Sequence, residues 1–85
     1  MSGDMTREEL EARLKGEFLA MFRNPEITSF KMGDWEFVMF KRDRLTDSSV
    51  EVYKYDVFVT RERLGRWKSF KGFLRSMVSL MFMLK

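Results

Sequence analysis

The sequence has no cysteine and no histidine among its 85 residues. Without cysteine the chain cannot form disulfides, iron–sulfur clusters or thiolate zinc sites, and it has no thiol nucleophile. Without histidine it lacks the commonest general base and the commonest metal ligand. These absences exclude most familiar active sites, and we predict a protein that is not an enzyme and uses no cofactor or metal.

Long apolar runs are also missing. The most apolar stretch, residues 77–84, is far shorter than the roughly 20 residues that cross a bilayer. The first ten residues are charged, which is untypical of a secretory signal peptide. A content of 45% hydrophobic residues, with nine Phe and eight Met, argues against disorder. We therefore expect one cytoplasmic domain over residues 6–85, preceded by a flexible tail at residues 1–5.

The formal net charge of +3 is unevenly distributed. Residues 1–40 contain five basic and eight acidic side chains, whereas residues 41–85 contain eleven basic and five acidic ones. Residues 61–75 alone hold six basic side chains and one acidic one. An anionic partner is therefore expected to meet the C-terminal half of the chain.

Local signals predict a helix at each end of the chain. Thr6 and Glu9 form a T-x-x-E capping box, and apolar residues then recur at helical spacing up to Asn24-Pro25, which predicts a helix over residues 7–23. A second helical stripe runs from Leu64 to Leu84, and Thr60 is a candidate cap for it.

Three extended segments are predicted between the helices, over residues 27–32, 35–40 and 50–60. The apolar phase of the third segment shifts near Val52-Tyr53, which indicates a bulge or a mixed face. We predict an α+β fold of order α-β-β-β-α, with a three-stranded antiparallel meander packed by two helices on one face or on both. A second apolar face is expected to need cover by a helix or by another protein. It comprises Val38, Phe40, Val50, Val52 and Phe58.

The C-terminal segment holds more apolar residues than one helical stripe can bury. Leu80, Phe82 and Met83 lie off the stripe formed by the other apolar residues. They indicate either a docking surface for a protein partner or second copy, or a deeply buried segment. The predicted partner-binding residues are Leu80, Phe82, Met83 and Trp67.

The second candidate site is the basic run that precedes this segment. Cations beside an aromatic ring can hold phosphates and stack on a base, and the alternative is a solvated helix face. The predicted anion- or nucleic-acid-binding residues are Arg61, Arg63, Arg66, Lys68, Lys71 and Arg75.

The predicted element order resembles that of double-stranded RNA-binding domains and of the small Alu-RNA-binding subunits of the signal recognition particle. In the first family, basic residues at the start of the last helix meet phosphates. Gly65, Lys68, Ser69 and Lys71 are loosely similar to that family's glycine- and lysine-rich signature. The paired glycines and adjacent lysines are missing, so no residue role is carried over.

The acidic residues Asp34, Glu36, Asp43 and Asp47 are scattered and indicate turns rather than a cation site. The leading hypothesis from the sequence is a small inhibitor or adaptor of the viral or phage accessory type, which docks on a protein through its C-terminal helix. The alternative is an RNA- or DNA-binding module that uses residues 61–75.

Overall fold

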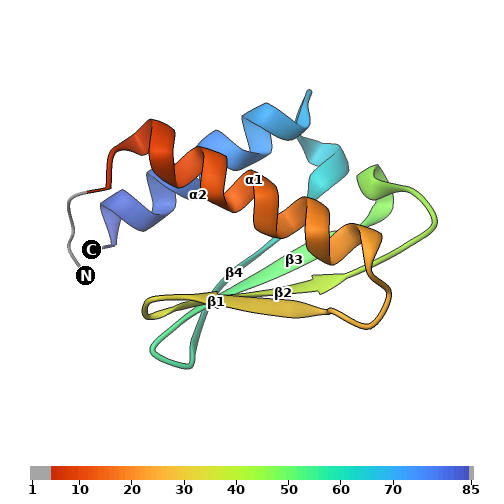
Figure 1. Ribbon diagram of the computed structural model, residues 1–85, viewed down its shortest axis with the longest axis horizontal. Helices are drawn as coiled ribbons and strands as arrows, with labels where there is room; N and C mark the ends of the chain where they lie inside the picture. The colour runs from red at the N-terminus through yellow and green to blue at the C-terminus, as the bar shows by residue number, and fades with distance from the viewer. Residues whose placement is uncertain (1–4, 85) are drawn as a thin grey trace.

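The computed structural model describes residues 5–84 and contains, within them, two helices and a four-stranded antiparallel sheet (Figure 1). The α+β class is therefore confirmed. The helices are α1 (Arg7–Arg23) and α2 (Phe70–Met83). The strands, which follow one another in the sheet, are β1 (Ser29–Met32), β2 (Trp35–Phe40), β3 (Ser49–Lys54) and β4 (Val57–Arg63). Two short 3-10 turns, η1 (Leu45–Asp47) and η2 (Leu64–Arg66), complete the chain.

The N-terminal helix has its predicted bounds and cap. The Thr6 hydroxyl accepts from the Glu9 amide at 3.1 Å, and the Glu9 carboxylate accepts from the Thr6 amide at 2.9 Å. Of the tail predicted at residues 1–5, residues 1–4 lie outside the described residues. Met5 packs against the hydrophobic core.

The prediction of three strands is wrong, because residues 50–60 form parts of two strands. Tyr55 and Asp56 make a two-residue turn with φ of 52° and 63°, values that glycine or asparagine usually supply. The phase shift predicted near Val52-Tyr53 is present as a register shift between β3 and β4. With four strands, the element order no longer matches the α-β-β-β-α order on which the resemblance to RNA-binding families rested.

The last helix begins later than its apolar stripe suggests. β4 continues to Arg63, and α2 starts at Phe70 with the Ser69 hydroxyl accepting from the Gly72 amide at 3.0 Å. Thr60 is therefore a strand residue and not a cap.

Both helices lie on one face of the sheet and leave the other face uncovered (Figure 1). Trp35, Phe37 and Met39 of β2 point toward the helices and are buried. The register pairs Phe37 with Val52 and Met39 with Val50, which places both valines on this covered face. The predicted second apolar face is therefore wrong for Val50 and Val52, and it retains Val38, Phe40 and Phe58.

Phe18 of α1 lies at the centre of the core. Its ring meets the rings of Phe30, Phe37 and Phe73 edge to face at 5.1–5.5 Å, so it joins α1 to β1, β2 and α2. Such pairs add to the stabilisation that burial alone supplies.

Between residues 5 and 84, neither helix combines the length and the apolar character that crossing a membrane requires.

Candidate functional site

The six predicted anion-binding residues do not form one helical face, because β4 and η2 intervene before α2. One half of the set lies on β4 and in η2: Arg61, Arg63 and Arg66. The other half is exposed in α2 or just before it: Lys68, Lys71 and Arg75.

The first half lines an open hollow at one end of the uncovered sheet face. We call it the arginine hollow and define it by Arg42, Arg61, Arg63, Arg66, Phe40 and Asp47. Arg42 and Arg63 also line an adjoining hollow on the same side. Four arginines and one phenylalanine thus line the same surface depression.

The sequence did not identify Arg42 as a site residue, and it named Phe40 only as part of the second apolar face. Phe40 is the last residue of β2 and Arg42 follows in the loop, while the register pairs Phe40 with Ser49 and Ser49 with Arg63. Residues more than twenty positions apart become neighbours through this pairing. A charge run along the sequence carries no sign of it, and only the strand register could have revealed it.

The loop that carries Arg42 is held by a buried serine. The Ser48 hydroxyl accepts from the Arg42 amide at 3.0 Å and donates to the Arg44 carbonyl at 3.1 Å. The Ser48 carbonyl in turn accepts from the Leu64 amide at 3.0 Å, which ties the loop to η2. Ser48 therefore has a structural role in positioning the arginine hollow.

Close contact between η1 and η2 fixes the floor of the arginine hollow. A Cβ atom at Gly65 would lie 2.4 Å from the Thr46 carbonyl oxygen, so only glycine fits at this position without a shift of the backbone. Arg63 and Arg66 flank Gly65, and their spacing from Arg42 across the hollow depends on this approach.

Lys41 directly precedes Arg42 in the sequence, but its ammonium group is held by the end of α1. Its ammonium group donates to the carbonyls of Met21 and Asn24, each at 2.6 Å, at the C-terminus of α1. A cation at this end of a helix is stabilised by the helix dipole. Lys41 therefore joins α1 to the sheet.

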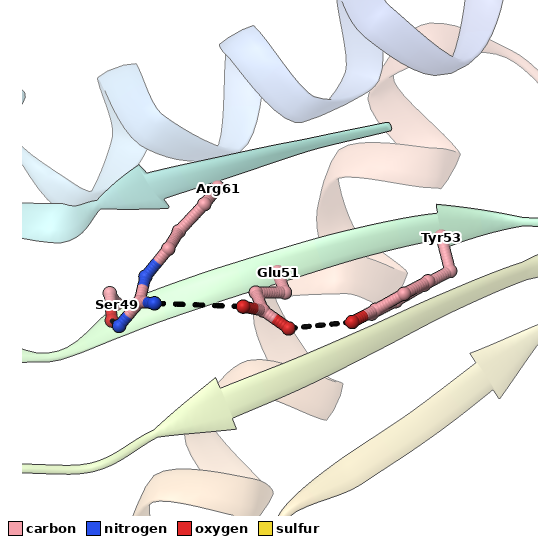
Figure 2. Close-up of polar contacts among 4 residues, drawn as sticks. All are labelled: Ser49, Glu51, Tyr53 and Arg61. Atoms are coloured by element: carbon pink, nitrogen blue, oxygen red, sulfur yellow. Dashed lines mark hydrogen bonds and ion pairs between the residues drawn. The ribbon is translucent and has the colours of Figure 1, made fainter. Parts of the chain in front are cut away.

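The centre of the uncovered face carries a polar network (Figure 2). Arg61 lies 3.6 Å from the Glu51 carboxylate and contacts the Ser49 hydroxyl at 3.3 Å. The Tyr53 hydroxyl donates to the same carboxylate at 2.6 Å. This hydrogen bond to Glu51 raises the pKa of Tyr53 above its ordinary value, since the bond needs the phenolic proton.

Two of the four arginines already have a carboxylate partner. Arg61 pairs with Glu51, and Arg66 lies 3.7 Å from the Glu62 carboxylate. Among residues 5–84, no carboxylate lies within ion-pair distance of Arg42 or Arg63. Basic residues outnumber acidic ones in the lining of the arginine hollow, which includes four arginines and Asp47, while Asp43 joins Asp47 in the adjoining hollow.

Aromatic rings are exposed on the same face as the arginines. Phe40 is 43% exposed, and the Arg61 guanidinium carbon lies 5.0 Å from its ring centre. Phe58 is 53% exposed and meets the Tyr53 ring edge to face at 5.7 Å. The uncovered face therefore presents two exposed aromatic rings, and a guanidinium group lies over one of them.

The predicted protein-docking residues are only partly available. Leu80, Phe82 and Trp67 are partly buried and pack against the core, whereas Met83 is 74% exposed. Lys54 contacts the Leu84 carbonyl and so brings the end of α2 to the β3–β4 turn. The exposed apolar residues around this contact form a patch that we call the C-terminal patch: Tyr55, Val57, Met83 and Leu84.

In the described part of the chain, no group of three or more acidic side chains could hold a metal ion. No protein-family model, no curated protein and no solved structure matches the chain.

Proposed function

We propose that this protein is a non-catalytic, cytoplasmic nucleic-acid-binding module that holds backbone phosphates in the arginine hollow. The observation that carries the proposal is the convergence of four arginines on one uncovered surface, two of them without an ion-pair partner in residues 5–84. The guanidinium group is planar and presents paired N–H donors that match two phosphate oxygens.

The architecture also supports a ligand of extended, anionic character. The helices leave one face of the sheet uncovered, and two of the four arginines, Arg61 and Arg63, lie on strand β4 at this face. Phosphate contacts supply most of the affinity in such complexes and make it strongly dependent on salt.

The test is fluorescence anisotropy with labelled oligonucleotides, single-stranded and duplex, titrated with salt. If the two arginines without an ion-pair partner each neutralise one phosphate, the logarithm of affinity should fall against that of salt with a slope of about −1.4 for a single strand. The double variant Arg42→Gln/Arg63→Gln should lower affinity at least about tenfold and remove most of this slope.

A matched control separates the arginine hollow from charge in general. Arg13→Gln/Lys15→Gln removes the same two charges from exposed positions of α1, on the other side of the sheet. This control should bind almost as tightly as the wild type. Equal losses in the two double variants, or no binding of either probe at low salt, would overturn the proposal.

A second candidate function is protein docking through the C-terminal patch. The specific observation that favours it is the 74% exposure of Met83 beside exposed Leu84, Tyr55 and Val57, since a flexible thioether adapts to irregular surfaces. A second copy of this chain is the partner that can be tested directly. Sedimentation velocity over a range of concentrations should show a dimer that Met83→Ser weakens, and a monomer throughout would exclude self-association.

A further inference from the structure

Resting on the proposed function, we infer that the nucleic acid bound here is single-stranded, with unpaired bases stacked on Phe40 and Phe58. Guanidinium groups alone are sufficient to bind phosphates, and they occur on many protein surfaces. The feature that distinguishes this face is the pair of exposed aromatic rings beside the arginines.

Phe40 lies within the arginine hollow. Its ring lines the same depression as Arg42 and Arg63, and it is 43% exposed although it sits on an interior strand of the sheet. A nucleotide whose phosphate reaches these arginines brings its base close to this ring. In a duplex the bases are paired and stacked inside, so only an unpaired base can present its face there.

Arg61 provides a second stacking surface next to Phe40. Its guanidinium carbon lies 5.0 Å from the centre of the Phe40 ring, and Glu51 and Ser49 hold the group in place (Figure 2). Both a phenylalanine ring and a guanidinium plane are surfaces on which bases stack. Ring and cation together form a preorganised stacking site that loses little side-chain freedom on binding.

A second ring lies at the other end of the same face. Phe58 is 53% exposed, and the Tyr53 ring supports it edge to face. Phe40 and Phe58 are separated by two strand spacings across the sheet and four residues of rise along it, which gives a direct distance of about 16 Å. A strand of several nucleotides can cover that distance, consistent with about 4–16 nucleotides at comparable single-strand sites.

The polar network between the two rings reduces repulsion between Glu51 and the phosphates of a bound strand. The Glu51 carboxylate lies under the route, and Arg61 and the Tyr53 hydroxyl both occupy its oxygens. A passing phosphate therefore meets a carboxylate that is paired with a cation and a hydroxyl donor, which lowers the repulsion between them. Stacking at both ends with phosphate contact at the arginine hollow is the arrangement that these contacts favour.

The experiment compares three probes of about 16 nucleotides with the same label: a single strand, its duplex, and an abasic strand that keeps the phosphates but lacks the bases. Wild-type protein should bind the single strand about tenfold or more tightly than the abasic strand, and more tightly than the duplex. Phe40→Leu should weaken binding of the normal strand by about 5-fold to 100-fold and leave the abasic strand unaffected. Phe58→Leu should act in the same direction.

Leucine keeps both positions apolar, and thermal unfolding of the variants checks that the fold is retained. Equal affinity for the normal and abasic strands, or a preference for duplex, overturns the stacking inference and leaves phosphate binding in the arginine hollow intact. Failure of every probe at low salt overturns both proposals.

Discussion

Phe37 and Phe40 are phenylalanines on the same strand, and they point to opposite faces of the sheet. Phe37 is fully buried between the helices and the sheet, in contact with the rings of Phe18 and Phe30. Phe40 is 43% exposed and touches a guanidinium group. The covered face forms a complete core with no contribution from the uncovered one. Aromatic residues on the uncovered face are therefore available for binding because stability does not depend on them.

The largest effect is expected when the buried and the exposed phenylalanine are each truncated to alanine. Phe37→Ala should lower the free energy of unfolding by about 3–5 kcal/mol, because it leaves a cavity at the centre of the core. Phe40→Ala should cost only about 1 kcal/mol or less, mainly the contact with Arg61. Urea unfolding of both variants measures the two losses. Similar losses would show that the uncovered face is part of the core.

The next largest effect is expected in the last turn of α2, where some of the predicted docking residues pack against the core and Met83 is exposed. Leu80→Ser/Phe82→Ser should cost about 2 kcal/mol for the pair, since both side chains pack partly against the core. Met83→Ser should change stability by less than about 0.5 kcal/mol. Thermal unfolding compares the variants, and a destabilising Met83→Ser would contradict its exposed placement.

A loss of comparable size is expected where η1 meets η2 beside the arginine hollow. Gly65→Ala should cost about 1–3 kcal/mol, since its Cβ meets the Thr46 carbonyl and the backbone must move. It should also weaken nucleic-acid binding, because Arg42 and Arg63 change their spacing. Gly16→Ala is the matched control, with open space around its Cβ in the middle of α1, and it should gain about 0.5–1 kcal/mol. A harmless Gly65→Ala would contradict the close contact of η1 and η2.

The smallest effect is a change of titration on the uncovered face. In a Tyr55→Phe background, Tyr53 should titrate above its ordinary pKa, and Glu51→Gln should bring that pKa back down. Because folding raises this pKa, the hydrogen bond stabilises the fold below pH ~10, and the contribution is lost as pH rises through the folded value. Ultraviolet titration of the phenol measures the shift. An unchanged pKa in the Glu51→Gln variant would show that the carboxylate is not its cause.

The sequence predicted the elements whose signals are local. The Thr6–Glu9 cap and the helical repeat of Leu10, Leu14 and Phe18 lie within one segment, and α1 has its predicted bounds. Trp35–Phe40 was predicted as a strand with the bounds that β2 has. The turn at Tyr55-Asp56 was missed because tertiary pairing holds two ordinary residues at positive φ, and neither is the glycine or asparagine that marks such turns.

The candidate site was harder to predict, for a different physical reason. Arg61, Arg63 and Arg66 were recognised from their charge, but Arg61 and Arg63 were placed in the segment leading into the last helix, and Arg66 was placed on that helix with Lys71 and Arg75. The polar run Arg61–Arg63 gives little sign of a strand, and its pairing with β3 decides the matter. Alternation along residues 35–40 placed Phe40 on one sheet face, but its approach to Arg63 depends on strand register, and Arg42 joins the site from the loop after β2; both links connect residues distant in sequence.

Contacts between the first turn of α1 and the last turn of α2 carry a consequence for chain order. The Arg7 guanidinium carbon lies 4.7 Å from the centre of the Phe82 ring, so the described chain forms nearly a closed circuit of elements. A circular permutant that links the two ends and opens the chain at Tyr55-Asp56 would keep α1, α2 and every strand in place. It would also release a turn with two residues at positive φ. The architecture is thus specified by which elements touch, and it does not require that α1 be made first.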